Sequence, residues 1–224
     1  MTQLIDLKLV KMGFSLQGVL DISAVNTLLP ESAREYGQLL VFGHGGKKLW
    51  QSIDSHSDKA NPIDDYSVAC IMDFLARIDC DQYDILYPTN MFNVDLRLLG
   101  QRLGWHHDSP LGIGINKTYG TWFAYRVVVA ANTNFEITKT HLSVSPCEDC
   151  ADKPCITHCP VDAVGDEFNL QACVGERARE GSACAYQCLA RRACPVGVAH
   201  RYDSEQIRYH YGRSLEAIRV RQIG

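Results

Sequence analysis

The sequence has little net charge and no long apolar run, and each shortage excludes a class of protein. Lysine and arginine number 22 against 26 aspartate and glutamate residues, a net charge of −4. The sequence therefore lacks the excess of basic residues that would indicate nucleic acid as a partner. No segment approaches the roughly 18 apolar residues of a membrane span, so we expect no membrane partner. Charged residues interrupt the apolar N-terminal stretch, unlike an export signal, which predicts a cytoplasmic protein.

The remaining composition is that of a globular protein. Hydrophobic residues make up 46% of the 224 residues and charged residues 21%, which excludes a disordered chain, a collagen and a coiled coil. No internal repeat or low-complexity tract is visible. A chain of this length buries roughly 70% of its unfolded surface, so it can form a substantial core.

Cysteine is unevenly distributed along the chain. Of ten cysteines, Cys70 and Cys80 lie in the first 146 residues, and the other eight fall between 147 and 194. A reducing compartment disfavours a disulfide framework, so the cluster predicts ligation of a soft metal. The eight expected metal ligands are Cys147, Cys150, Cys155, Cys159, Cys173, Cys184, Cys188 and Cys194.

The spacing of these cysteines favours iron and sulfide over zinc. The first four form C-x2-C-x4-C-x3-C-P, whereas a zinc site usually shows two separate C-x2-C pairs. The pattern resembles dicluster ferredoxins, in which the fourth cysteine binds the other cluster. That resemblance implies two [4Fe–4S] clusters, one on Cys147, Cys150, Cys155 and Cys194, the other on Cys159, Cys173, Cys184 and Cys188.

The second half-motif leaves an alternative open. Its gaps of three residues between Cys184 and Cys188 and five between Cys188 and Cys194 depart from the usual two and three. Cys184 and Cys188, four positions apart, could share one face of a helix. A single cluster with some free cysteines is the alternative.

The sequence before the cysteines alternates helix-like and strand-like patterns, which predicts an α+β class. Three domains are expected: an α/β core over 1–143, a ferredoxin-like module over 144–200, and a helix over 201–224 that packs on the core. Within the core we expect helices at 2–13, 62–78 and 93–103, strands at 14–22, 38–42 and 83–87, a glycine turn at 43–46, and a hairpin joining 113–115 to 121–131.

Two core segments carry a resemblance to known families. Residues 99–105 end in Leu-Gly-Trp, and residues 112–126 contain Asn-x-x-Tyr-Gly-Thr-Trp-Phe. Together with the cysteine module they resemble epoxyqueuosine reductases. The stretch Gly120–Arg126 also resembles CblC cobalamin-processing proteins, and reductive dehalogenases share the architecture. The resemblance implies a nitroreductase-related α/β core that binds a corrinoid, followed by a dicluster module.

The resemblance implies that cobalamin binds largely through backbone and shape, since glycine lets the backbone approach a flat macrocycle closely. Trp105, Trp122 and Phe123 would line its cavity or simply pack in the core. A flavin is the less favoured cofactor. The implied cofactor-binding residues are Gly112, Gly114, Ile115, Asn116, Tyr119, Gly120 and Trp122.

The sequence supplies no histidine ligand for cobalt. The segment beginning Asp54-Ser55-His56 approaches the motif D-x-H-x-x-G but carries Lys59 where glycine is required. The resemblance therefore implies the base-off mode. His44, within a glycine-rich segment, could face a ligand, whereas His106 and His107 are interpreted as loop residues.

The catalytic residue remains unknown at this stage. Epoxyqueuosine reductases carry an aspartate general acid upstream of Leu-Gly-Trp, and the nearest carboxylates here, Asp84 and Asp95, lie out of register. Tyr87, Tyr119 and Tyr125 are candidate proton donors by type alone.

The sequence thus predicts an iron–sulfur oxidoreductase. Electrons from a ferredoxin or flavodoxin would pass through two clusters to cobalamin, for reductive chemistry on a small-molecule substrate or on the cobalamin itself. The alternatives are a ferredoxin-like electron carrier without corrinoid, an epoxyqueuosine (tRNA) reductase and a cobalamin chaperone.

Overall fold

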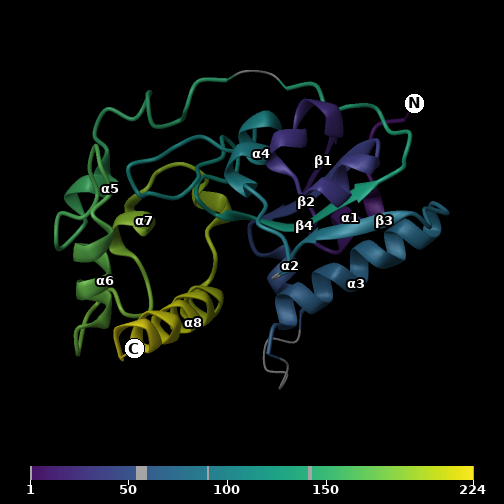
Figure 1. The fold of residues 1–224 in the computed structure, drawn as a ribbon. Helices are drawn as coiled ribbons and strands as arrows, with labels where there is room; N and C mark the ends of the chain where they lie inside the picture. Colours follow the sequence, from purple (N-terminus) through teal and green to yellow (C-terminus); the bar gives the residue numbers. More distant parts are fainter. Residues whose placement is uncertain (1, 54–59, 90, 141–142, 224) are drawn as a thin grey trace. The chain divides into compact units, whose positions relative to one another are not determined.

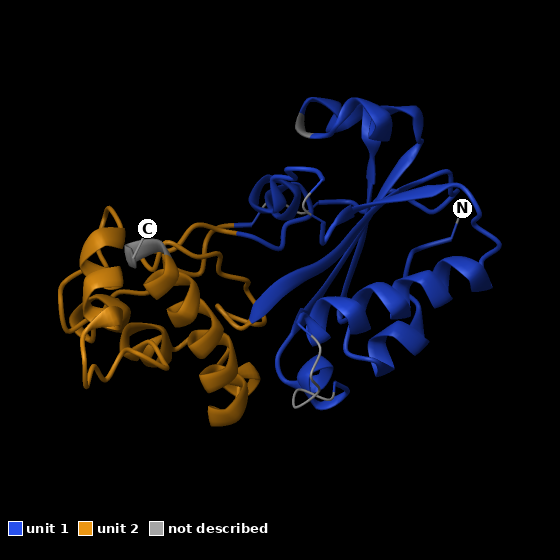
Figure 2. Cartoon of the chain, turned by 60° about the horizontal axis from the view of Figure 1, so that its bottom comes forward, with its two compact units in different colours: residues 1–106, 123–143 blue, residues 107–122, 144–224 orange. Residues whose placement is uncertain are grey.

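The computed structural model describes residues 2–53, 60–89, 91–140 and 143–223. The chain divides into two compact units, which Figure 2 shows in different colours. The first unit comprises residues 1–106 and 123–143, and the second comprises residues 107–122 and 144–224. The segment 107–122, which holds most of the residues implied to bind a corrinoid, thus belongs to the unit that contains the clustered cysteines.

The first unit is built on a four-stranded antiparallel sheet in the order β1-β2-β4-β3 (Figure 1). Leu40 of the central strand β2 faces Val19 of β1 and Val129 of β4. Six consecutive residues of β2 are buried, so both faces of the sheet are covered at its centre. The strands are β1 (Leu16–Asp21), β2 (Gln38–Gly45), β3 (Tyr83–Tyr87) and β4 (Phe123–Ala131).

One long helix, α3 (Pro62–Arg77), packs against β4. Pro62 occupies its first turn, where a missing N–H costs nothing. Phe74 of α3 meets Phe42 of β2 edge to face at 5.7 Å and stacks with Phe135 at 6.3 Å. The other helices of this unit are α1 (Leu7–Lys11), α2 (Lys48–Gln51), α4 (Leu96–Arg102) and three 3-10 helices, Ile22–Ala24, Asn26–Leu28 and Glu31–Glu35.

The structure confirms the α+β class and corrects several local predictions. The strand expected to end at Phe42 continues to Gly45 through an irregular step in its pairing with β4, so residues 43–46 are not a turn. His44 is therefore a buried strand residue, 1% exposed, and accepts a hydrogen bond from Arg126 Nε at 3.0 Å. Strand pairing has overridden the local turn signal of the glycines.

The predicted hairpin is also wrong. Ile115 bridges to His107, and β4 pairs with β2 and β3.

The first helix begins only after Asp6, whose carboxylate accepts from the Leu9 N–H at 2.7 Å. Asn61 precedes α3, but its side chain does not cap that helix. The Asp54–Lys59 motif lies outside the described residues.

The second unit is loop-rich and has little apolar core. One buried cluster joins Leu111, Cys155, Val164 and Ala190, and another joins Trp122, Tyr202 and Ile207. Helix α5 contacts α7, and α6 contacts α8. The helices are α5 (Pro154–Thr157), α6 (Leu170–Ala178), α7 (Leu189–Ala193) and α8 (Ser204–Ile223), with a 3-10 turn at Val198–His200.

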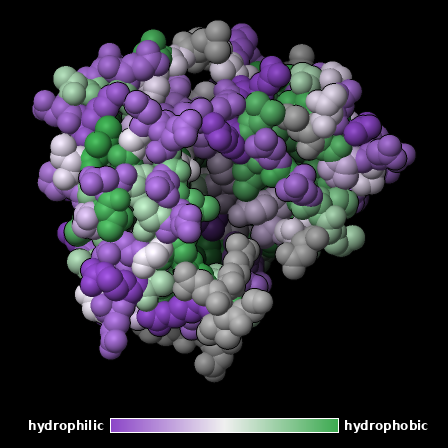
Figure 3. Space-filling view, turned by 60° about the vertical axis from the view of Figure 1, so that its left-hand side comes forward, coloured by the Kyte–Doolittle hydropathy of each residue, from purple (hydrophilic) through white to green (hydrophobic). Residues whose placement is uncertain are grey.

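Helix α8 was expected on the α/β core, and the division of the chain places it in the second unit. Arg177 of α6 bonds to Ser214 and to the Tyr211 carbonyl of α8. Hydrophilic residues cover most of the face seen in Figure 3, with smaller apolar areas between them. None of the helices within the described ranges is long and apolar enough to span a membrane.

Candidate iron–sulfur site

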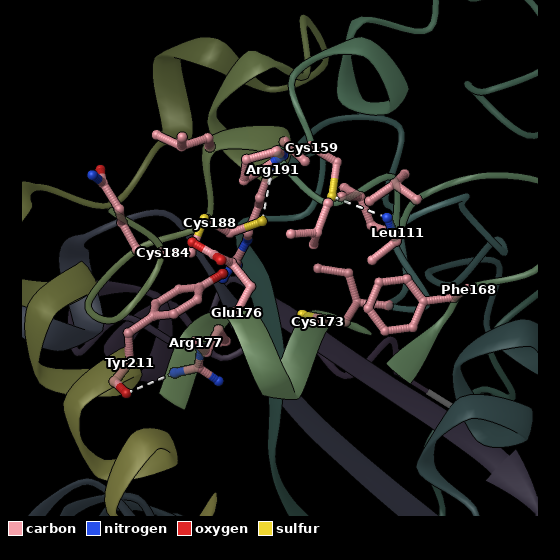
Figure 4. A pocket seen from close by; sticks show the side chains of 18 residues that line it. Leu111, Cys159, Phe168, Cys173, Glu176, Arg177, Cys184, Cys188, Arg191 and Tyr211 are labelled. Carbon is pink, nitrogen blue, oxygen red and sulfur yellow. Dashed lines mark hydrogen bonds between the residues drawn. The ribbon is translucent and has the colours of Figure 1, made fainter. Parts of the chain in front are cut away.

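Four cysteine thiols line one cavity of about 160 Å³ in the second unit (Figure 4). They are Cys159, Cys173, Cys184 and Cys188, which the sequence assigned to the second cluster. The rest of the wall is mostly apolar, and includes Leu111, Val164, Phe168, Leu189 and Ala190. A mostly apolar cavity lined by four thiols is a suitable environment for a soft metal cluster.

Local backbone structure places each of these thiols. Cys173 lies in α6, whose first turn is capped by Asn169 accepting from the Ala172 N–H at 3.0 Å. Cys188 is the N-cap of α7, and its sulfur accepts from the Arg191 N–H at 3.3 Å. Cys188 has extended backbone angles, so Cys184 and Cys188 do not share a helical face as expected.

A third sulfur of the cavity also receives a backbone hydrogen bond. Cys159 follows α5, and the Ala163 N–H donates to its sulfur at 3.2 Å. Such N–H···S bonds stabilise negative charge on a thiolate ligand. Two of the four sulfurs in the cavity therefore receive a backbone N–H of the kind that supports a metal-bound thiolate.

The other four cysteines form a second group. Burial raises the pKa of Cys147, and the thiolates of Cys194 and Cys150 raise it further. Burial also raises the pKa of Cys155, again with contributions from Cys194, Cys147 and Cys150. Cys155 lies in α5 and Cys194 at the end of α7, two helices in contact. This group is the set that the sequence assigned to the first cluster.

The same electrostatic coupling links the thiols of the cavity. Burial raises the pKa of Cys173, the thiolates of Cys188, Cys159 and Cys184 raise it further, and the Arg177 cation opposes them. Burial raises the pKa of Cys184, while the Leu189 N–H lowers it. Four crowded thiolates repel one another, and bound cations would remove that repulsion.

The thiols are not arranged around a single ion. Among the described residues, no three His, Cys, Asp or Glu side chains surround one point closely enough to hold a metal ion. A zinc ion would hold four sulfurs at about 2.3 Å from one centre. In a cubane cluster each thiolate binds a different iron, so the sulfurs stand farther apart. The two-cluster ligand assignment stays a prediction.

Cys70 and Cys80 lie in the first unit and take no part in either group. Both are buried, and burial raises the pKa of each thiol. Cys80 donates to the Gln82 carbonyl at 3.7 Å. They behave as small core residues.

Two cationic side chains of the cavity were not identified from sequence. Arg177 and Arg191 both line it. Arg177 follows Cys173 by four positions in α6, and Arg191 follows Cys188 by three. This spacing, which places side chains on one face of a helix, is the only sequence signal that could have found them.

The residues implied to contact a corrinoid form a tight loop in the second unit. Asn116 and Gly120 exchange backbone hydrogen bonds, and the Asn116 side chain accepts from the N–H groups of Thr118 and Tyr119. A Cβ at Gly120 would lie 2.2 Å from the Val196 carbonyl oxygen. Packing within this unit thus already requires glycine at this position.

Other members of that set are also held by protein contacts. A Cβ on Gly112 would meet Phe168 at 2.9 Å. Ile115 and Trp122 are each 1% exposed, and Trp122 packs edge to face with Tyr202 at 5.3 Å. Gly114 is half-buried, and its role stays a prediction.

Two buried polar atoms of the second unit have no hydrogen-bond partner in the described part of the chain and could meet a cofactor. They are Trp122 Nε1, a donor, and Gln206 Oε1, an acceptor. Both residues are 1% exposed, and an unsatisfied buried group costs about 1–3 kcal/mol. Amide groups on the rim of a corrinoid could supply both missing partners, so these residues are compatible with that cofactor.

The candidate proton donors sit in different surroundings. Burial raises the pKa of Tyr87 and of Tyr125. Tyr125 stacks with Trp105 at 6.4 Å, and its hydroxyl lies 3.3 Å from His106 Nδ1. Tyr119 packs against His200 at 4.8 Å. Asp95 is the N-cap of α4 and accepts from the Leu98 N–H at 2.9 Å, a structural role.

Comparison with known proteins identifies the fold. No family model matches the sequence, and no curated protein matches it either. Among solved structures, the epoxyqueuosine reductase from Streptococcus thermophilus matches 86% of this chain with a TM-score of 0.52 and 14% identity. An epoxyqueuosine reductase bound to a modified tRNA-Tyr stem loop matches 88%, with a TM-score of 0.52 and 12% identity.

The catabolic reductive dehalogenase NpRdhA matches 93% of this chain with a TM-score of 0.54 and 13% identity. The chain spans 65% of the length of the two epoxyqueuosine reductases and 33% of the dehalogenase. The resemblance predicted from two core segments and the cysteine module is confirmed at the level of structure. The chain has the fold shared by epoxyqueuosine reductases and B12-dependent reductive dehalogenases.

Proposed function

We propose that this protein is an iron–sulfur reductase that carries two [4Fe–4S] clusters and delivers electrons to a bound cobalamin. The observation that carries the proposal is the apolar cavity lined by four thiols. Cys159, Cys173, Cys184 and Cys188 would hold one cluster, and Cys147, Cys150, Cys155 and Cys194 the other. Each cluster supplies one-electron chemistry at a potential set by nearby charge, hydrogen bonds and exposure.

The protein around the clusters would insulate and tune them. Leu111, Val164 and Phe168 give the cavity an apolar wall that would limit the access of water to a cluster. The N–H groups of Ala163 and Arg191 donate to two of its sulfurs. Ten free thiols suit a reducing compartment such as the cytoplasm.

Cobalamin, when bound, supplies a cobalt centre that accepts electrons and reacts reductively. Trp122 Nε1 and Gln206 Oε1 would bond to its amide groups, because both atoms are buried without a protein partner. The loop from Asn116 to Gly120 would hold Trp122 in place. A ferredoxin or flavodoxin is the expected electron donor, and a small molecule or the cobalamin itself the acceptor.

A second candidate function is a ferredoxin-like electron carrier without corrinoid. The observation that favours it is the packing of Gly112 against Phe168 and of Gly120 against Val196. These contacts explain both glycines without a macrocycle. This candidate shares the clusters and differs only in the final acceptor.

Anaerobic purification with iron analysis and a visible spectrum, with and without cobalamin, separates the two. We expect about eight irons per chain and a base-off cobalamin spectrum after mixing. Eight irons with an unchanged cobalamin spectrum would favour the electron carrier, and flavin bands would identify the other cofactor. Absence of iron after reconstitution would refute both functions.

A matched pair of variants tests the corrinoid contacts. Trp122→Phe removes the unpartnered N–H, so cobalamin binding should weaken while the iron content stays unchanged. Trp50→Phe replaces a buried tryptophan of the first unit and serves as the control. Equal affinity in the two variants would remove Trp122 from the proposed site.

A further inference from the structure

Arg177 presents an unpartnered donor at the wall of the four-thiol cavity. Its Nη1 donates to Ser214 Oγ at 2.8 Å and its Nη2 to the Tyr211 carbonyl at 2.9 Å. Its Nε is buried and has no hydrogen-bond partner in the part of the chain that the structure describes. The residue is 9% exposed and lines the cavity (Figure 4). A buried donor at this position calls for an acceptor in the cavity.

The charge of Arg177 is held by neutral groups, a hydroxyl and a carbonyl. The adjacent carboxylate, Glu176, bonds to both Nε and Nη2 of Arg179, at 3.0 and 2.8 Å, and also to Ser182. Burying a cation is unfavourable unless an anion lies near it. Four thiolates on an iron–sulfide core carry net negative charge, so a cluster would be that anion.

A second cation flanks the same cavity. Arg191 of α7 donates to Thr121 Oγ1 at 3.2 Å and to the Thr121 carbonyl at 2.5 Å, again neutral groups. Its guanidinium lies 4.3 Å from the centre of the Trp122 ring. These contacts fix a second positive charge at the wall of the cavity.

The group of Cys147, Cys150, Cys155 and Cys194 has charges of both signs nearby, since Arg201 donates to the Cys194 carbonyl at 2.9 Å and Lys153 follows the first two cysteines. The loop that carries its first cysteines also carries three exposed carboxylates, Glu148, Asp149 and Asp152. Negative charge beside a cluster disfavours the added electron, and positive charge favours it.

We infer that Arg177 donates its Nε–H to the cluster held by Cys159, Cys173, Cys184 and Cys188, and that its charge, with that of Arg191, raises the reduction potential of this cluster. The inference rests on the proposed function for the presence of the cluster. On reduction the oxidised cluster takes one electron from a one-electron donor, such as dithionite, and gains one negative charge.

The expected effect is large enough to measure. A unit charge within about 12 Å, at an effective dielectric of about 20, changes the ratio of reduced to oxidised cluster about tenfold. Arg177 lines the cavity, so it lies well within that distance. Tenfold corresponds to about 59 mV for a one-electron couple.

The test is an EPR-monitored redox titration of the full chain with reconstituted clusters. Arg177→Gln should keep the iron and lower the ratio of reduced to oxidised cluster at fixed potential at least tenfold for one of the two clusters. Arg177→Lys, which keeps a charge, should fall between Gln and wild type. Arg192→Gln removes an exposed charge on the same helix as Arg191, and because water and salt screen an exposed charge, it should lower that ratio much less than Arg177→Gln. Full iron with unchanged potentials in Arg177→Gln would overturn the inference.

A measurement on the unchanged sequence covers the case in which Arg177→Gln loses the cluster. Protein with arginine labelled by ¹⁵N only in the guanidinium group should show hyperfine coupling between nitrogen and the reduced cluster. Arg177→Lys should abolish that coupling. A cluster without the coupling would refute the hydrogen bond, whereas absence of iron in the wild type would refute the proposed function instead.

Discussion

Replacing Gly120 by alanine should destabilise the second unit whether or not a corrinoid is bound. Gly120 has a φ of +58°, and an added Cβ would lie 2.2 Å from the Val196 carbonyl oxygen. The left-handed backbone costs an L-residue roughly 1–2 kcal/mol. Displacing a backbone carbonyl adds about 1–3 kcal/mol. We therefore expect a loss of about 3 kcal/mol in the free energy of unfolding.

Two other glycines separate these contributions. Gly181 has a φ of +70° but nothing within 4 Å of its added Cβ, so alanine there should cost about 1 kcal/mol from the backbone alone. Gly175 lies within α6 with open space around it, so alanine should stabilise the helix by about 0.5–1 kcal/mol. The free energy of unfolding should therefore be lowest in Gly120→Ala, higher in Gly181→Ala and highest in Gly175→Ala.

The assay is anaerobic urea unfolding followed by the visible absorbance of the clusters, with thermal unfolding beside it. For a chain of this size each kcal/mol shifts the melting temperature by about 2–4 °C. Gly120→Ala should therefore melt about 6–12 °C below wild type. If Gly120→Ala loses no more stability than Gly181→Ala, the Val196 carbonyl does not prevent a side chain at this position. If Gly120→Ala loses stability only when cobalamin is present, close approach of the macrocycle is the reason for glycine at this position.

Three further predictions concern the ligands, a helix cap and the core. Cys155→Ala should remove about half of the iron and Cys70→Ala none, and iron analysis that showed loss in Cys70→Ala would contradict the ligand assignment. Burial raises the pKa of Asp6, but hydrogen bonds from Arg77 and the Leu9 N–H outweigh it and leave the pKa below its usual value. A lowered folded pKa stabilises the protein above the unfolded value of about 3.9 and loses that effect as pH falls through the folded pKa. Asp6→Asn keeps a capping side chain but loses the ion pair with Arg77, so it should cost up to about 1 kcal/mol at pH 7 and progressively less toward pH 2, which urea unfolding across this range would check. Phe74→Ala should cost about 3–5 kcal/mol, whereas Met72→Ala, on the exposed face of the same helix, should stay within about 0.5 kcal/mol.

The regular elements of the first unit could be predicted where local and tertiary signals agree. The strand expected at 83–87 is β3, and the helix expected to begin at Pro62 is α3. The glycines after Phe42 misled the prediction because β4 supplies hydrogen-bond partners through Gly45. The expected hairpin failed because the turn from Asn116 to Gly120 closes a small loop of its own.

The cysteines of the candidate site could be predicted from the sequence, whereas its buried arginine could not. The resemblance of the cysteine spacing to dicluster ferredoxins implied which thiols would lie together, because in that pattern the last cysteine of each motif joins the other group. Arg177 could not be recognised in the same way, because an arginine on a helix is usually solvated. Its burial depends on Ser214 and Tyr211, which come from a helix more than thirty residues later.

The two groups of thiols are interleaved along the chain. Cys159 follows the first motif yet lies with the later cysteines, and Cys194 ends the second motif yet lies with the earliest. Each group therefore ties together segments made at different times during synthesis. Residues 155 and 194 enclose a loop of roughly 40 residues, whose closure costs chain entropy that bound iron would repay. The segment through Cys194 must therefore leave the ribosome before the four thiols of the first group can meet.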